Sequence, residues 1–271
     1  VAAPQTPPVM LGTFDGIGGT GQDTSMTDVA VSATGDVWAV SGHYVYSLEM
    51  PGGGVVHCAN TTSLNTPSGV RFYALTFAPK GVIDANTEVL VAGNSAGELW
   101  TIDAAGTANV HGNFGIVPAN DGHGHTYANA GKPWELSGDI VFLANSGDPV
   151  GFATVRDCPN PPSTTGCSTV DTLIQIDLTK LATATSATVV TLNLRGQIVP
   201  KASCSGGVTG YGSMYGIAAL GADVYGFSRK GDIVAIDNVD GSACLLQTIA
   251  ADKWAGAGVT TLAEVVAPPP S

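Results

Sequence analysis

The sequence predicts an all-β fold, and three observations support that prediction. Glycine contributes 36 and proline 16 of the 271 residues, which suits many short strands joined by tight turns. Hydrophobic residues make up 44% and charged residues only 12%, so the chain is too apolar for a disordered protein. Finally, short strand-like patterns recur in a fixed order along the chain, which indicates a repeat architecture.

The clearest repeat is a five-residue pattern that begins with an apolar residue and ends with an aliphatic residue and an acid. Its four copies are residues 45–49, 99–103, 173–177 and 233–237. A turn-like stretch follows each copy. Because an acidic side chain that enters a turn can accept backbone N–H bonds, we expect these acids to be structural.

Other strand patterns surround each copy in the same order. One lies immediately upstream, at 36–40, 88–92, 150–154 and 223–227. A small-residue strand precedes it, at 27–31, 73–77, 137–141 and 215–219. A fourth run follows the acidic motif, as at 54–58 and 244–248. Small residues suit the crowded inner strand of a propeller blade, so each repeat predicts one four-stranded antiparallel blade.

The ends of the chain bear on the number of blades. Residues 257–261 resemble a fifth inner strand, and residues 9–14 resemble an outer strand. Pairing the two in one blade would close the ring and remove open edges. We therefore predict a five-bladed propeller over residues 8–265, with four or six blades as alternatives, flanked by proline-rich segments at 1–7 and 266–271. A β-sandwich or β-helix does not predict four strand types in constant order.

This repeat resembles secreted bacterial β-propeller proteins of the broad WD40-like and NHL-like kind. The resemblance is architectural, because the GH and WD dipeptides of true WD40 repeats are missing. It implies a secreted or cell-surface protein of a bacterium, and it implies no particular activity.

The charge balance argues against two classes of partner. The chain carries 22 acidic and 10 basic residues, a net charge of −12. Such a surface repels nucleic-acid phosphates and anionic membranes. No apolar run approaches the roughly 18 residues of a membrane span, so we expect no membrane insertion.

Five cysteines indicate an oxidising environment, although a fully reduced set is the alternative. Cys158 and Cys167 flank a loop without strand character, a spacing that predicts a disulfide. At most two of Cys58, Cys204 and Cys244 can pair within the chain, and the sequence leaves their pairing open.

Four long irregular segments carry the candidate binding residues. Segments 59–72, 115–135, 157–171 and 197–214 are predicted to lie on one face of the propeller, because they are either connections between blades or the loop between second and third strands. Long loops on a rigid scaffold often carry function.

Within these loops, two groups of side chains are candidates. Asp121, His123 and His125 could hold zinc or another transition metal, the alternative being ordinary exposed loop histidines. Trp134 and Glu135 could offer an aromatic platform and a carboxylate to a sugar.

Asp28 and Asp139 fall in inner strands and could approach the central channel. Carboxylates there could hold Ca²⁺, or could instead accept backbone amides at the strand starts. We find no G-x-S-x-G, HExxH or phosphate-loop motif. The first hypothesis is therefore a non-catalytic propeller that binds a protein or glycan through its loop-rich face. The alternatives are a Ca- or Zn-dependent hydrolase with a channel site and a self-associating structural subunit of an extracellular assembly.

Overall fold

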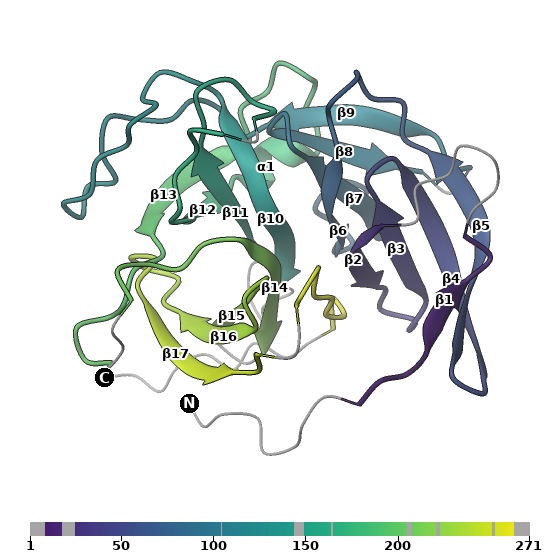
Figure 1. Ribbon diagram of the computed structural model, residues 1–271. Coiled ribbons are helices and arrows are strands. Elements are labelled where there is room, and N and C mark those ends of the chain that lie inside the picture. Colours follow the sequence, from purple (N-terminus) through teal and green to yellow (C-terminus); the bar gives the residue numbers. More distant parts are fainter. Residues whose placement is uncertain are drawn as a thin grey trace.

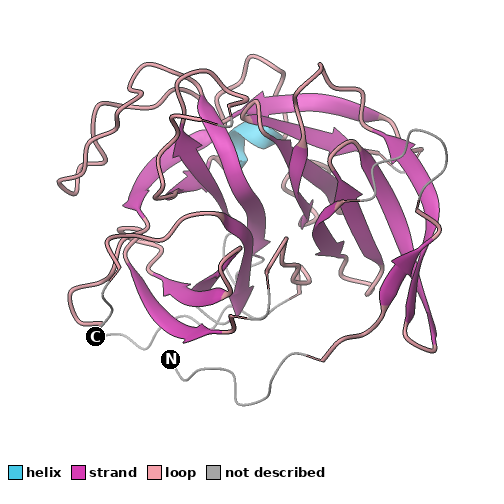
Figure 2. Ribbon diagram, viewed as in Figure 1, coloured by secondary structure: helices cyan, strands magenta, loops and turns pink. Residues whose placement is uncertain are grey.

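The computed structural model confirms the all-β prediction, with four antiparallel sheets arranged as the blades of a propeller ring (Figures 1 and 2). It describes residues 9–17, 25–103, 105–143, 149–163, 165–204, 208–220, 223–250 and 253–262. The predicted proline-rich segments 1–7 and 266–271 lie outside these residues. Five blades are not confirmed, since the described residues form four sheets.

The four sheets correspond to the four predicted repeats. The first blade contains β2 (Met26–Val31), β3 (Val37–Ser41), β4 (Tyr44–Gly52) and β5 (Val55–Ser63), and the second contains β6 (Phe72–Ala78), β7 (Val89–Asn94), β8 (Glu98–Ile102) and β9 (Ala108–Asn113). The third contains β10 (Trp134–Leu143), β11 (Val150–Asp157), β12 (Thr172–Ile176) and β13 (Thr191–Gln197), with the short helix α1 (Leu178–Leu181) before β13. The fourth contains β14 (Met214–Leu220), β15 (Asp223–Ser228), β16 (Asp232–Ile236) and β17 (Ala243–Thr248).

The acids that end the repeated motif mostly play the expected structural part. Asp103 accepts the amides of Ala105 and Thr107 at 2.9 and 2.8 Å. Asp177 caps α1, and Asp237 accepts the amide of Val239 at 2.9 Å. In the first blade the strand continues past Glu49 to Gly52, so this acid enters no turn.

The N-terminal strand lies elsewhere than predicted. β1 (Thr13–Asp15) pairs in parallel with β5 and adds a fifth strand to the outer edge of the first blade. Asp15 Oδ1 and His57 Nδ1, 2.5 Å apart, join the two strands. The prediction that N- and C-terminal strands close the ring within one blade is therefore wrong.

Residues 253–262, called the closing segment below, fill the space between the fourth and first blades (Figure 1). Among the described residues, large apolar clusters occupy the other three spaces between blades. The closing segment instead forms one isolated parallel bridge, from Thr260 to Val31 of β2. At its end, the Thr261 hydroxyl donates a hydrogen bond to the carboxylate of Glu88, the residue before β7. The fifth predicted inner strand is thus an extended segment without a sheet of its own.

The cysteine pattern is resolved by two disulfides. Cys158–Cys167 confirms the predicted bridge, and Cys204 pairs with Cys244, which leaves Cys58 as a buried thiol. In the described part of the chain, no helix has the length and apolar character needed to cross a membrane.

Candidate functional site

Three of the four long loops of the predicted binding face contact one another around one end of the ring. The Asn129 amide donates to Asp157, and the backbone amide of Gln197 donates to Asp121. The amide of Asp171 donates to the carbonyl of Tyr211. These bonds join segments 115–135, 157–171 and 197–214, as the strand order predicts.

Three inner strands each contain a bulge near this end, and each bulge redirects one side chain. In β2, β6 and β14 the pairing register skips one residue, which is Thr27, Tyr73 and Tyr215 respectively. Bulges commonly turn a side chain away from its place in the pleat. All three of these residues line the same cavity, at the loop-face end of the ring.

The cavity has a volume of about 370 Å³ and is assembled from distant parts of the chain. The first blade and its approach supply residues 25–27, the second supplies Arg71 and Tyr73, and the fourth supplies Tyr215 and Arg229. The closing segment adds Lys253, Trp254 and Ala255. This size lies near the lower end of the range for small-molecule pockets.

The lining is cationic although the chain as a whole is acidic. Arg71, Arg229 and Lys253 all line it, from a chain with only 10 basic residues and a net charge of −12. None of the described lining residues is a carboxylate. Within the described ranges, neither Arg229 nor Lys253 forms an ion pair, whereas Arg156, Lys180 and Lys201 each do. The described lining of the cavity is therefore positively charged.

Aromatic rings form the rest of its wall. The rings of Tyr73 and Tyr215 lie 6.0 Å apart at 64°, and the Arg229 guanidinium lies 5.7 Å from the centre of the Tyr215 ring. Trp254 packs edge-on against Phe227 at 5.6 Å. Burial raises the pKa of the Tyr73 hydroxyl above its usual value, so this group stays a neutral hydrogen-bond donor at physiological pH.

The two predicted channel aspartates join neighbouring blades. Asp28 Oδ2 accepts the Leu75 amide at 2.6 Å, and Asp139 Oδ2 accepts the Ile217 amide at 2.8 Å. Each bond links one inner strand to the next. This contact matches the backbone-amide alternative considered for both residues.

Burial also changes the charge of these aspartates. Asp28 is 2% and Asp139 0% exposed, and burial, together with their proximity, raises the pKa of Asp28. Burial raises the pKa of Asp139 to about 8. The pair therefore holds a proton at neutral pH.

These carboxyls fit Ca²⁺ poorly. Both oxygens of Asp139 already accept amides, from Ile140 and Ile217, and only Asp28 Oδ1 lacks a donor. Ca²⁺ takes about six to eight oxygen ligands. Among the described residues, Asp28 and Asp139 belong to no group of three or more potential metal ligands, and calcium binding by this pair stays a prediction.

Asp121, His123 and His125 lie together, but the carboxylate organises its own loop. Asp121 accepts the amides of His123 and His125 at 2.8 and 3.0 Å, and its other oxygen lies 2.7 Å from His125 Nδ1. Burial alone would raise the pKa of Asp121, yet hydrogen bonds from His125, His123 and Gln197 hold it at about 2. In the described part of the chain, these residues do not meet the geometry of a three-ligand metal group.

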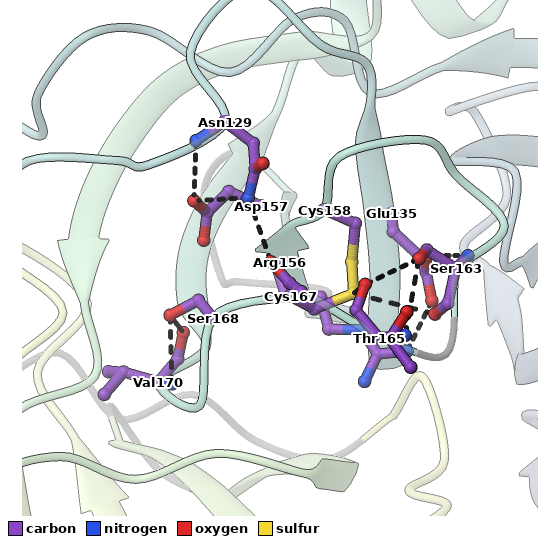
Figure 3. Close-up of a disulfide and its surroundings, with 11 residues drawn as sticks. Asn129, Glu135, Arg156, Asp157, Cys158, Ser163, Thr165, Cys167, Ser168 and Val170 are labelled. Atoms are coloured by element: carbon purple, nitrogen blue, oxygen red, sulfur yellow. Dashed lines mark hydrogen bonds and ion pairs between the residues drawn. A yellow bond between two sulfur atoms is a disulfide. The ribbon is translucent and has the colours of Figure 1, made fainter.

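Trp134 and Glu135 are both internal, so neither offers a surface platform. Trp134 is 2% exposed and meets Tyr127 edge-on at 5.2 Å. Glu135 is 1% exposed, pairs with Arg156 and accepts the Ser163 amide at 2.8 Å. Figure 3 shows this carboxylate beside the Cys158–Cys167 disulfide, where it anchors the loop to β11.

Sequence reasoning missed the cavity, although one signal pointed to it. Tyr73 and Tyr215 occupy the same first place in two of the four inner-strand repeats. An aromatic residue is out of keeping with an otherwise small-residue strand, and that contrast could have marked both positions. Arg71, Arg229 and Lys253 lie outside the repeated patterns, so no comparable signal exists for them.

Comparison with known proteins finds solved structures of low similarity and no family. No family model matches the chain, and no curated protein does. Two crystal structures of BBS1N in complex with ARL6DN, one soaked with lead and one with mercury, are similar to this chain. Their sequence identities to it are 13% and 12%, and their TM-scores are 0.33 and 0.36. They match over 76% and 79% of this chain and over 48% and 49% of BBS1N-complex chains.

The extracellular domain of a hybrid two component system from B. thetaiotaomicron is also similar. It is 12% identical with a TM-score of 0.39, over 84% of this chain and 26% of that one. The chain thus spans half or less of each of these three chains. Similarity at this level gives no basis for transferring a partner or activity.

Proposed function

We propose that this protein is a non-catalytic binding module that holds a protein or glycan ligand on the loop-rich face of its propeller. The cavity at the channel mouth is the observation that supports the proposal. Its aromatic and cationic side chains come from the second and fourth blades and the closing segment. A rigid scaffold that presents convergent polar and aromatic groups in a concave site is typical of ligand binding.

We further propose that the protein works outside the cell or at its surface. Two disulfides support this location, because such bonds persist mainly in oxidising compartments. The hydrolase and the self-associating subunit remain predictions, and no specific contact among the described residues favours either over the binding module.

Filling the cavity tests the proposal without removing any of its contacts. Ala255 is exposed and lines the cavity, so Ala255→Trp places a bulky ring in the space a ligand would use. Wild type and variant are compared on a glycan array and in pull-downs from extracellular extracts, with Ala187→Trp, on an exposed loop remote in sequence, as the matched control.

We expect at least one ligand that binds wild type and Ala187→Trp equally well. Its affinity for Ala255→Trp should be at least tenfold lower. If every ligand found binds all three proteins equally, the cavity is not the binding site and the proposal fails.

A further inference from the structure

Resting on the proposed function, we infer that the cavity binds an acidic saccharide, a sugar unit that carries a carboxylate or a sulfate. The inference depends on three properties of the lining: its charge, its rings and its size. The two anionic groups offer the same chemistry to the cavity, and the experiment below distinguishes them.

Charge is the first property. Arg229 and Lys253 enter the cavity from the fourth blade and the closing segment, and neither is neutralised by a described carboxylate. Arg71, just before the first strand of the second blade, also lines the cavity. Gathering like charges in one concavity costs free energy, which an anionic ligand would offset. A guanidinium also bonds carboxylate or sulfate oxygens in a bidentate geometry that a neutral sugar cannot use.

The rings indicate what the anion is attached to. Tyr73, Tyr215 and Trp254 offer aromatic surface beside the cations. The C–H-bearing face of a pyranose ring is apolar and slightly positive, which complements the negative face of an aromatic ring. An aspartate or glutamate side chain of a peptide has no comparable flat surface. The combination therefore favours a sugar over an acidic peptide.

Size and hydrogen bonding agree with this class of ligand. A volume of about 370 Å³ suits a short segment of a chain, such as one or two sugar units, rather than a folded partner. Sugar hydroxyls need nearby donors and acceptors, and the lining supplies hydroxyls from Thr27 and Tyr73. The Thr27 hydroxyl lies 3.1 Å from the carbonyl oxygens of both Val40 and Phe72, which share its single proton, so its oxygen remains an acceptor for a ligand.

The test is calorimetric titration of the full chain with three oligosaccharides of equal length: an oligogalacturonate, a sulfated galactan fragment and a neutral galactan fragment. We expect at least one of the two acidic probes to bind at least tenfold more tightly than the neutral one, with an affinity that falls as salt increases. Arg229→Gln and Lys253→Gln should each weaken acidic binding roughly tenfold. Lys230→Gln, a change at the exposed neighbour of Arg229 that does not line the cavity, should leave it unchanged.

The outcomes separate this inference from the proposed function. Equal binding of neutral and acidic probes, lost in Ala255→Trp, would overturn the acidic preference and keep the binding module. An anionic phosphopeptide that binds in the cavity when no saccharide does would likewise overturn only the saccharide class. Failure of every probe and every array ligand to depend on Ala255→Trp would overturn both.

Discussion

Asp28 and Asp139 are buried between blades of the ring, where the neutral form of a carboxyl is favoured over the charged form. Each accepts an amide from the next inner strand, and each has lost its contact with water. Because the pKa of both carboxyls is raised on folding, the proton they hold stabilises the folded state at low pH. That contribution is complete below the ordinary aspartate pKa and is lost as pH rises through the folded value, which is about 8 for Asp139.

Asp28→Asn should therefore flatten the pH dependence of stability. The amide oxygen can still accept the Leu75 N–H, and the amide nitrogen can replace the proton at Oδ1, the atom that lacks a donor. We expect the wild-type unfolding temperature to fall between about pH 6.5 and 8.5, and the variant to fall less and exceed wild type at the upper end. Thermal unfolding followed by circular dichroism measures both.

Two comparisons keep that measurement specific. Asp171, whose pKa burial raises to about 6, titrates mainly below the chosen range. Glu49→Gln changes an exposed acid and should reproduce the wild-type slope. If the slope for Asp28→Asn equals that of wild type, the aspartate pair does not control stability in this pH range.

Single residues also show where sequence reasoning stops. The Cys158–Cys167 bridge was predictable because a short loop brings its own ends together. Trp134 and Glu135 were misplaced at the surface, because the sequence does not reveal that Tyr127 and Arg156 cover them.

At the scale of elements, the strands of all four repeats could be predicted because each pattern is local. The two elements that were misjudged depend on distant neighbours instead. β1 has three residues, and its parallel partner lies about forty residues away, at Val55 to His57. The closing segment has the small residues of an inner strand, yet it lies between two blades whose sheets are already complete.

Gly256→Ala should loosen the closing segment. A Cβ at this position would lie 2.1 Å from Asp28 Oδ1 and 2.5 Å from Asp28 Cα, so β2 and the segment would have to separate. We expect a loss of about 1–3 kcal/mol in the free energy of unfolding, measured in urea. Ala255→Ser, at the exposed neighbour, should cost much less. Equal stability of the two variants would mean that the segment does not pack closely against β2.

At the scale of the whole molecule, the sequence predicted a propeller ring but could not predict the cavity at its loop-face end. Blade order follows from repetition, whereas the cavity arises only when residues from the first, second and fourth blades meet the closing segment. The net charge of −12 was likewise a poor guide to the site, because an average conceals three cations gathered in one place.

The Cys204–Cys244 disulfide, which joins positions 40 residues apart, should contribute more to stability than Cys158–Cys167, which joins positions 9 apart. Closing the longer loop removes more entropy from the unfolded chain. We expect Cys204→Ser/Cys244→Ser to cost about 4 kcal/mol and Cys158→Ser/Cys167→Ser about 3 kcal/mol. Urea unfolding without reductant measures both, and the reverse order would contradict the loop-closure account.

The junction between the fourth and first blades, which the closing segment fills, is the seam of the ring. The far end of this segment is held by one isolated bridge and by hydrogen bonds from the Thr260 and Thr261 hydroxyls to Ser32 and Glu88, rather than by a shared sheet. Lys253 and Trp254, at its start, line the cavity. A molecule bound in the cavity would contact residues on both sides of the seam and hold them together. A ligand that binds only the closed ring would therefore also stabilise the ring against unfolding.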